Sequence, residues 1–173
     1  MTKLVPTYEP KEGKKCNLAS GARPLPGFDN YDIMDHPEVI KTDLFQLPWP
    51  IPSNTYDYLF CSHFLEHVPH SHNGIYPLFI RVIQEINRIC KNGALVEILL
   101  PMPSFTMLAY PDHTRIVTVK SFCKEQAAGR YIIEQESYLR TGQWHIKKYL
   151  GITIGPKTSQ LLLFRMGKPD EGK

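Results

Sequence analysis

The sequence has few cysteines and no close pair of them. Its four cysteines are spread over 173 residues, none belongs to a CxxC pair, and each lies in or beside an apolar segment. This spacing argues against a disulfide-stapled secreted domain, because such domains are small and dense in cysteine. We interpret the four residues as buried thiols of a protein in a reducing compartment.

The sequence also lacks a long apolar run and a strong excess of one charge. Its N-terminus has no stretch suited to a signal peptide and no segment approaches the length of a membrane span, so we expect a cytoplasmic protein that does not enter a membrane. Lys and Arg number 20 against 17 Asp and Glu, a net charge of +3. That balance is too mild to indicate a nucleic-acid partner.

The length predicts a single domain that can bury its own core. Residues 1–13 carry Pro6, Pro10 and Gly13 among charged side chains, and we expect them to form an irregular arm. The domain should then cover residues 14–166, followed by a polar tail over 167–173. No internal repeat is present.

The most informative stretch runs from residue 56 to residue 68. Leu59, Phe60 and Cys61 form an apolar run with aromatic neighbours, which is typical of a parallel strand covered on both faces. Polar and titratable side chains follow at once: Ser62, His63, Glu66 and His67. Ligands of open α/β sheets bind outside the carboxyl ends of the strands, so a site is expected here.

Three earlier strands are predicted over residues 15–18, 28–33 and 39–42. The first is followed by a turn of small residues over which a ligand can approach the backbone: Ala19, Ser20 and Gly21. The second ends at Asp32 and the third at Asp43–Leu44. Between the first two strands, Pro24 and Pro26 exclude the helix that usually connects parallel strands.

The clearest helix is predicted over residues 75–90, where apolar residues recur at the helical period and Arg81, Gln84, Glu85 and Arg88 face away. Residues 91–93 should cap it, with Gly93 in a left-handed conformation. A buried strand over 94–100 then completes a right-handed crossover. Further on, Thr118 could cap a helix to about residue 127. Strands are expected over 131–136, 146–152 and 159–166, the last two as an antiparallel hairpin at a sheet edge.

This order of pieces resembles the class I S-adenosylmethionine (SAM)-dependent methyltransferases, especially the broad methyltransferase type 11 group, over roughly residues 14–122. The segments that carry the resemblance are YDYLFCSHFLEHV and KNGALVEILLP. It implies an α/β, Rossmann-like, mostly parallel sheet with an antiparallel C-terminal hairpin: a minimal methyltransferase fold that lacks the usual first helix.

The resemblance also implies a cofactor site for SAM or its product S-adenosylhomocysteine (SAH). Ala19, Ser20 and Gly21 would lie against the methionine moiety, and Asp32 would bind the ribose hydroxyls. The remaining cofactor residues would be Asp43 and Leu44 at the adenine, and Ser62 and His63 beneath the sulfonium. The methyl acceptor is not identified by the sequence. It would be bound by a partner, by a second subunit as in a homodimer, or by the loop around His113.

Methyl transfer to oxygen or nitrogen also needs a base, and His113 is the best candidate because its loop should reach the same rim as His63. A pairing of His113 with Asp112 is the alternative, and Tyr110 could shape the acceptor pocket. A fold kept as a binding or assembly module, without catalysis, is a second hypothesis. The missing helix and sparse glycines favour it.

The histidines allow two metal hypotheses. His63, Glu66 and His67 match the HxxEH pattern of inverted zinc peptidases, with Glu134 or Glu136 as third ligand, but Pro69 leaves no room for the long helix this requires. In a milder version, similar to some O-methyltransferases, Glu66, His67 and His113 hold a divalent ion. The alternative is that Glu66 caps a short helix and His67 bonds locally.

Overall fold

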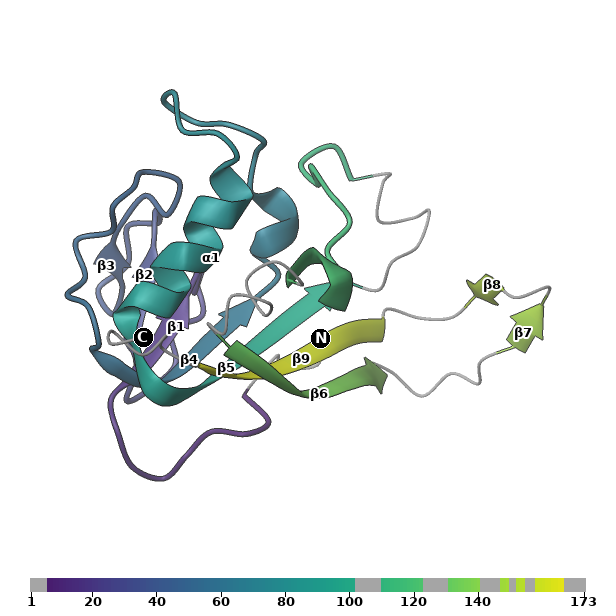
Figure 1. The fold of residues 1–173 in the computed structure, drawn as a ribbon, viewed down its shortest axis with the longest axis horizontal. Helices are drawn as coiled ribbons and strands as arrows, with labels where there is room; N and C mark the ends of the chain where they lie inside the picture. The colour runs from purple at the N-terminus through teal and green to yellow at the C-terminus, as the bar shows by residue number, and fades with distance from the viewer. Residues whose placement is uncertain are drawn as a thin grey trace, which may run out of the picture.

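The computed structural model describes residues 6–101, 110–122, 131–140, 147–149, 152–154 and 158–166. There the chain forms a seven-stranded sheet in the order β3-β2-β1-β4-β5-β9-β6 and a two-stranded sheet of β7 and β8 (Figure 1). The first five strands of this order pair in parallel, and β9 runs antiparallel to both β5 and β6. This is the mostly parallel, Rossmann-like sheet that the sequence predicts.

The parallel strands lie where the sequence predicts them, with small changes at their ends. Their bounds are β1 (Lys15–Leu18), β2 (Asp29–Asp32), β3 (Ile40–Lys41), β4 (Tyr56–Ser62) and β5 (Cys90–Pro101). β4 lies between β1 and β5, which explains its apolar run, since a central parallel strand is covered on both faces. The absence of a helix between β1 and β2 is confirmed, because residues 19–28 contain only turns and irregular backbone.

The predicted helix is present but shorter, and of its predicted cap only the left-handed conformation of Gly93 is confirmed. The helix α1 spans Leu78–Ile89, after Pro77 in an extended conformation. It does not begin at Ile75, because residues 72–75 form a tight turn closed by hydrogen bonds between His72 and Ile75. Residues 91–93 belong to β5 instead of capping the helix, and Gly93, at φ +80°, lies where the register of β4 and β5 shifts.

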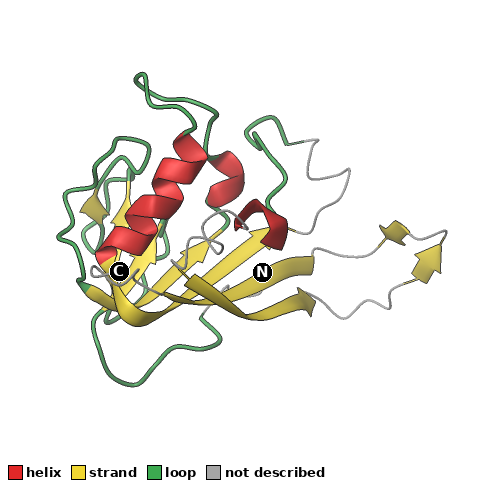
Figure 2. Ribbon diagram, in the orientation of Figure 1, coloured by secondary structure: helices red, strands yellow, loops and turns green. Residues whose placement is uncertain are grey.

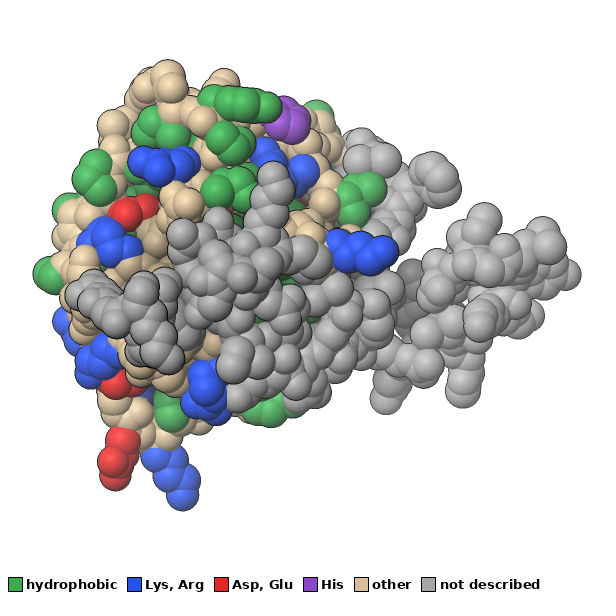
Figure 3. Space-filling model, viewed as in Figure 1, with side chains coloured by type: hydrophobic (Ala, Val, Ile, Leu, Met, Phe, Trp, Pro, Cys, Tyr) green, Lys and Arg blue, Asp and Glu red, His purple; other side chains and the backbone are tan. Residues whose placement is uncertain are grey.

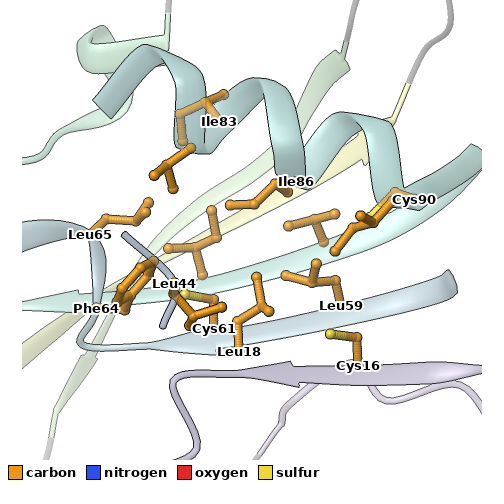
Figure 4. Packing of buried hydrophobic residues seen from close by; sticks show 14 of the residues in the cluster. Cys16, Leu18, Leu44, Leu59, Cys61, Phe64, Leu65, Ile83, Ile86 and Cys90 are labelled. Carbon is orange, nitrogen blue, oxygen red and sulfur yellow. The ribbon is translucent and has the colours of Figure 1, made fainter. Parts of the chain in front are cut away.

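α1 covers one face of the sheet and forms the main core with it (Figure 2). Ile86 points from the helix toward the strands beneath, which carry Leu18, Leu59 and Cys61 (Figure 4). Among them Leu18, Leu59 and Ile86 are at most 1% exposed. Each such side chain stabilises the fold by about 1.5–3 kcal/mol. This packing fixes the strand ends that precede the candidate site.

The opposite face carries a smaller cluster and a buried acid that the sequence analysis missed. Tyr58, Phe60 and Leu99 are buried there. Beside them, the fully buried Glu97 carboxylate accepts hydrogen bonds from the Tyr58 hydroxyl and from the backbone N–H groups of Thr7 and Tyr8. The described part of the N-terminal arm is irregular, and these bonds hold it against the sheet.

The C-terminal strands pair differently from the prediction. β6 (Tyr131–Arg140) and β9 (Thr158–Met166) form the antiparallel pair, and β9 also joins β5. The predicted strand over 146–152 is instead two short ones, β7 (Lys147–Tyr149) and β8 (Ile152–Ile154), which pair with each other.

The helix predicted from Thr118 is also different in the described residues. A 3-10 helix, η2, spans Val119–Phe122, and the Ser121 hydroxyl accepts a hydrogen bond from the Thr118 N–H. Residues 123–127 lie outside the described ranges. Within those ranges no helix has the length and apolar character needed to cross a membrane. On the face seen in Figure 3, Lys and Arg side chains are scattered among hydrophobic ones.

Candidate functional site at the carboxyl edge of the sheet

The sheet brings the predicted cofactor residues into one row along a single edge. Leu18 at the end of β1 pairs with Tyr31 of β2 and with Cys61 of β4, and Asp32 pairs with Lys41 of β3. The residues that follow these strands therefore lie in spatial order from Asp43 through Asp32 and residues 19–21 to Ser62 and His63. This is the edge at which parallel sheets bind ligands.

The turn after β1 is tied to the acid after β2. Asp32 Oδ2 accepts a hydrogen bond from Gly21 N–H at 2.8 Å, and Oδ1 accepts one from Met34 N–H at 2.9 Å. Gly21 has φ +55°, and a Cβ placed on it would meet no atom within 4 Å, so the space above this residue is open. Each carboxylate oxygen has a second lone pair, which leaves Asp32 able to accept further hydrogen bonds.

Two residues of the row have left-handed backbone that is unusual for their type. Ala19 after β1 has φ +55° and His63 after β4 has φ +52°. Such a conformation costs roughly 1–2 kcal/mol for residues other than glycine and concentrates at ligand sites. Both residues are among those expected at the cofactor, but their strained backbone is not visible in the sequence.

The segment after β3 presents its backbone to the edge. Asp43 Oδ1 accepts a hydrogen bond from Phe45 N–H at 2.9 Å, which closes a turn around Leu44. The Leu44 side chain is buried in the core at 5% exposure, so only its backbone can face a ligand. Beside this turn, the Phe45 ring stacks on Phe64 with centroids 5.8 Å apart. The stacking joins the β3 end to the β4 end.

At the end of β4 lie two buried polar atoms without a partner among the described residues: Ser62 Oγ and Glu66 Oε2. Buried polar atoms normally have a hydrogen-bond partner. Glu66 is in the short 3-10 helix η1 (Leu65–His67) and is fully buried. Its Oε1 lies 3.2 Å from His63 Nδ1, so the carboxylate contacts an imidazole instead of capping the helix.

The loop that contains His113 folds back onto η1. Thr114 N–H donates to Glu66 O at 2.9 Å and the Thr114 hydroxyl donates to Val68 O at 2.7 Å. The His113 ring lies edge-on to His67, with centroids 4.8 Å apart, and stacks on Tyr110 at 5.1 Å.

Asp112 contacts His67 through both its side chain and its backbone. The His67 Nδ1 atom lies 3.3 Å from Asp112 Oδ2 and 3.2 Å from its carbonyl oxygen. The role of Thr114 in tethering this loop is not visible in the sequence, because a contact across 48 residues leaves no local pattern. Glu66, His67 and His113 thus come together, with one ligand atom of each within 4.8 Å of the others.

The nearby cysteine does not supply a nucleophile. Burial raises the pKa of the Cys61 thiol far above its usual range, and the charge of Glu66 raises it further. The thiol is therefore protonated at neutral pH, and the edge of the sheet offers carboxylate, hydroxyl and imidazole groups for chemistry.

Solved structures share this fold. A SAM-dependent methyltransferase from Methanosarcina mazei is 13% identical, with a TM-score of 0.61 over 94% of this chain and 96% of that chain. The N-methyltransferase NodS from Bradyrhizobium japonicum, solved in complex with SAH, is 10% identical, with a TM-score of 0.59 over 90% of this chain and 79% of its own. The chain thus has the fold of class I SAM-dependent methyltransferases, as the sequence predicts.

No family model and no curated protein matches the sequence. The narrower likeness to the type 11 group therefore stays a prediction.

The described residues fit the polar groups of SAM. Asp32 has acceptor capacity for a diol, Ser62 Oγ is a buried hydroxyl that lacks a partner among the described residues, and Gly21 leaves open space beside the turn. The feature that departs from the common arrangement is the missing helix after β1. Its N-terminus would have favoured an anionic group near the turn.

Proposed function

We propose that this protein is a SAM-dependent methyltransferase. The observation that carries the proposal is the turn after β1: it is strained at Ala19 and bonded through Gly21 N–H to the acid that ends β2. Two neighbouring strands thus place an open turn and a carboxylate side by side at the ligand-binding edge. The fold supports the same assignment.

In this proposal the row of strand ends holds the cofactor. Asp32 accepts hydrogen bonds from the ribose hydroxyls, residues 19–21 lie along the methionine moiety, and Asp43 with the Leu44 backbone faces the adenine. Ser62 and His63 form the floor near the sulfonium. When bound, SAM supplies an electrophilic methyl group, and the protein's part is to align an acceptor with it.

The acceptor would bind beside η1, where the loop around His113 approaches. His113 is the proposed general base for an oxygen or nitrogen acceptor, and the exposed ring of Tyr110, stacked on it, offers a wall for an apolar part of the acceptor. We keep the cytoplasmic location, and a partner or homodimer that completes the acceptor site, as expectations from the sequence.

The first test is calorimetric titration with SAM and SAH of the native protein and of an Asp32→Ala variant. We expect binding in the native protein and at least a tenfold loss of affinity in the variant. Each hydrogen bond from a ribose hydroxyl to the Asp32 carboxylate should contribute about 1.5–3 kcal/mol. Asp35→Ala is the matched control, because Asp35 is an exposed acid three residues away that forms an ion pair with Lys41. No binding to the native protein at millimolar cofactor would contradict the proposal.

A binding module without catalysis is the second candidate, favoured by the absence of a helix in residues 19–28. It predicts SAM or SAH binding with no methyl transfer in a screen of acceptors that covers hydroxyl, amine and thiol groups. Turnover of SAM to SAH with any acceptor would eliminate it.

A further inference from the structure

Glu66 is a buried acid whose surroundings are incomplete. Its side chain is 0% exposed, and among the described residues its Oε2 has no hydrogen-bond partner. A buried carboxylate with an unpaired oxygen is costly unless a cation or a metal ion faces it. Its contacts in the structure are to imidazoles: His63 Nδ1 at 3.2 Å and His67 Nε2 at 4.0 Å, both from Oε1.

His67 is oriented as a metal-binding histidine would be. Its Nδ1 faces the Asp112 carbonyl oxygen at 3.2 Å, and a carbonyl can only accept, so Nδ1 carries the proton. In the neutral ring the lone pair then lies on Nε2, the atom that faces Glu66. A carbonyl or carboxylate that accepts the proton of the other ring nitrogen, and so fixes the ring, is the usual partner of a metal-bound imidazole.

His113 supplies a third group from a separate part of the chain. The hydrogen bonds of Thr114 to Glu66 O and Val68 O hold its loop on η1. One ligand atom each from Glu66, His67 and His113 then lies within 4.8 Å of the other two. Three ligands around one ion at about 2.1 Å would be about 3.4 Å apart, so the side chains need to close by little more than 1 Å.

We propose that Glu66, His67 and His113 form a binding site for one divalent transition-metal ion. Two imidazoles and one carboxylate suit Zn²⁺, Fe²⁺ or Co²⁺ better than Mg²⁺, which prefers oxygen ligands and keeps its waters. Three protein ligands leave open positions on the ion.

The use of the ion rests on the proposed function. An acceptor hydroxyl bound at an open position of the ion would have its pKa lowered. The ion would then activate the acceptor in place of a general base, and His113 would serve as a ligand of the ion. Binding of the ion itself does not depend on methyl transfer.

The test is Co²⁺ titration of chelator-treated full-length protein, followed by visible absorption, with Zn²⁺ calorimetry in parallel. We expect one ion per chain and ligand-field bands from nitrogen and oxygen ligands. Glu66→Gln, His67→Asn and His113→Asn should each weaken binding at least tenfold, since even outer-shell changes cost about 10–100-fold. His70→Asn is the matched control, because His70 is exposed and lies outside the cluster.

Three results would overturn the site: no Co²⁺ bands at 100 µM ion, binding unchanged in His113→Asn, or equal loss in His70→Asn. Because Glu66 is buried, His113→Asn on the loop is the decisive variant, and circular dichroism verifies that it folds. SAM calorimetry on ion-free protein separates the two proposals. Cofactor binding without metal binding overturns the metal site alone, and metal binding without cofactor binding overturns the proposed function.

Discussion

At the scale of single residues, Tyr58 and Glu97 form a buried pair that anchors the N-terminal arm. The Tyr58 hydroxyl donates to a carboxylate that also accepts the N–H groups of Thr7 and Tyr8, and burial followed by this bond raises the pKa of Tyr58. Tyr58→Phe leaves the carboxylate one donor short. We expect the free energy of unfolding to fall by about 1.5–3 kcal/mol, as for other hydrogen bonds to charged groups, in urea denaturation followed by circular dichroism.

Tyr76→Phe is the control for this prediction. Tyr76 is 75% exposed, so its loss of a hydroxyl should change the free energy of unfolding by no more than about 0.5 kcal/mol. Equal free energies of unfolding for the two variants would show that the Tyr58 hydrogen bond makes no net contribution to stability.

The buried cysteines give a second prediction at this scale. Cys16 and Cys61 are 0% exposed, and burial raises the pKa of both thiols. Since the thiolate is the reactive form, iodoacetamide at pH 8 should leave both unmodified in the native protein and modify them in 8 M urea. Peptide mass spectrometry reads the two sites separately. Rapid alkylation of either in the native state would contradict their placement in the core.

At the scale of elements, one ion pair on α1 holds the proline-rich loop between β3 and β4. Glu85 accepts the Trp49 N–H at 2.8 Å and pairs with Arg88, which donates to Ile51 O at 2.7 Å. The sequence pattern placed Glu85 on the outer face, yet it is only 9% exposed because the loop covers it. The helical period of a sequence cannot show that a loop from another part of the chain covers the polar face of the helix.

Glu85→Gln should therefore loosen this loop. We expect a loss of about 1–3 kcal/mol of stability, because a charged acceptor of a buried N–H is replaced by a neutral one. Hydrogen exchange should accelerate at Trp49 more than in β4. Arg81→Ala is the control on the same helix, since Arg81 is exposed and its side chain donates to Gln84 on the helix itself. Unchanged hydrogen exchange at Trp49 in Glu85→Gln would show that Glu85 does not hold the loop.

At the scale of the whole molecule, the sequence allowed the sheet to be predicted and named Glu66, His67 and His113 as possible metal ligands, but it did not show the contacts that bring these three residues together. The apolar run of β4 and the acids after β2 and β3 are local signals, and parallel pairing then brings the strand ends together. The tether from Thr114 to Glu66 joins segments 48 residues apart, and the β6–β9 pairing depends on competition among strands. Neither leaves a periodic pattern, so only the fold reveals them.

Acid should destabilise the whole molecule by protonating two carboxylates that form ion pairs in the folded state. Hydrogen bonds from the Lys91 side chain and Lys14 N–H lower the pKa of Asp57. Burial would raise the pKa of Glu85, but bonds from Arg88 and Trp49 N–H outweigh it and lower that pKa as well. A carboxyl group with a lower pKa in the folded state stabilises the fold above its unfolded value, near 4, and loses this effect as the pH falls through the folded value.

We therefore expect the free energy of unfolding to decline below about pH 4, mainly through Glu85, because Asp57 is 37% exposed and solvent screens its pairing with Lys91. A double variant, Asp57→Asn with Glu85→Gln, should be less stable than the native protein at pH 7, and the difference should shrink toward pH 2.5. Asp35→Asn removes a 92% exposed carboxylate and should leave the native pH profile unchanged. Urea denaturation from pH 7 to 2.5 measures all three proteins, and a difference that stays constant with pH would show that neither carboxyl group is linked to folding.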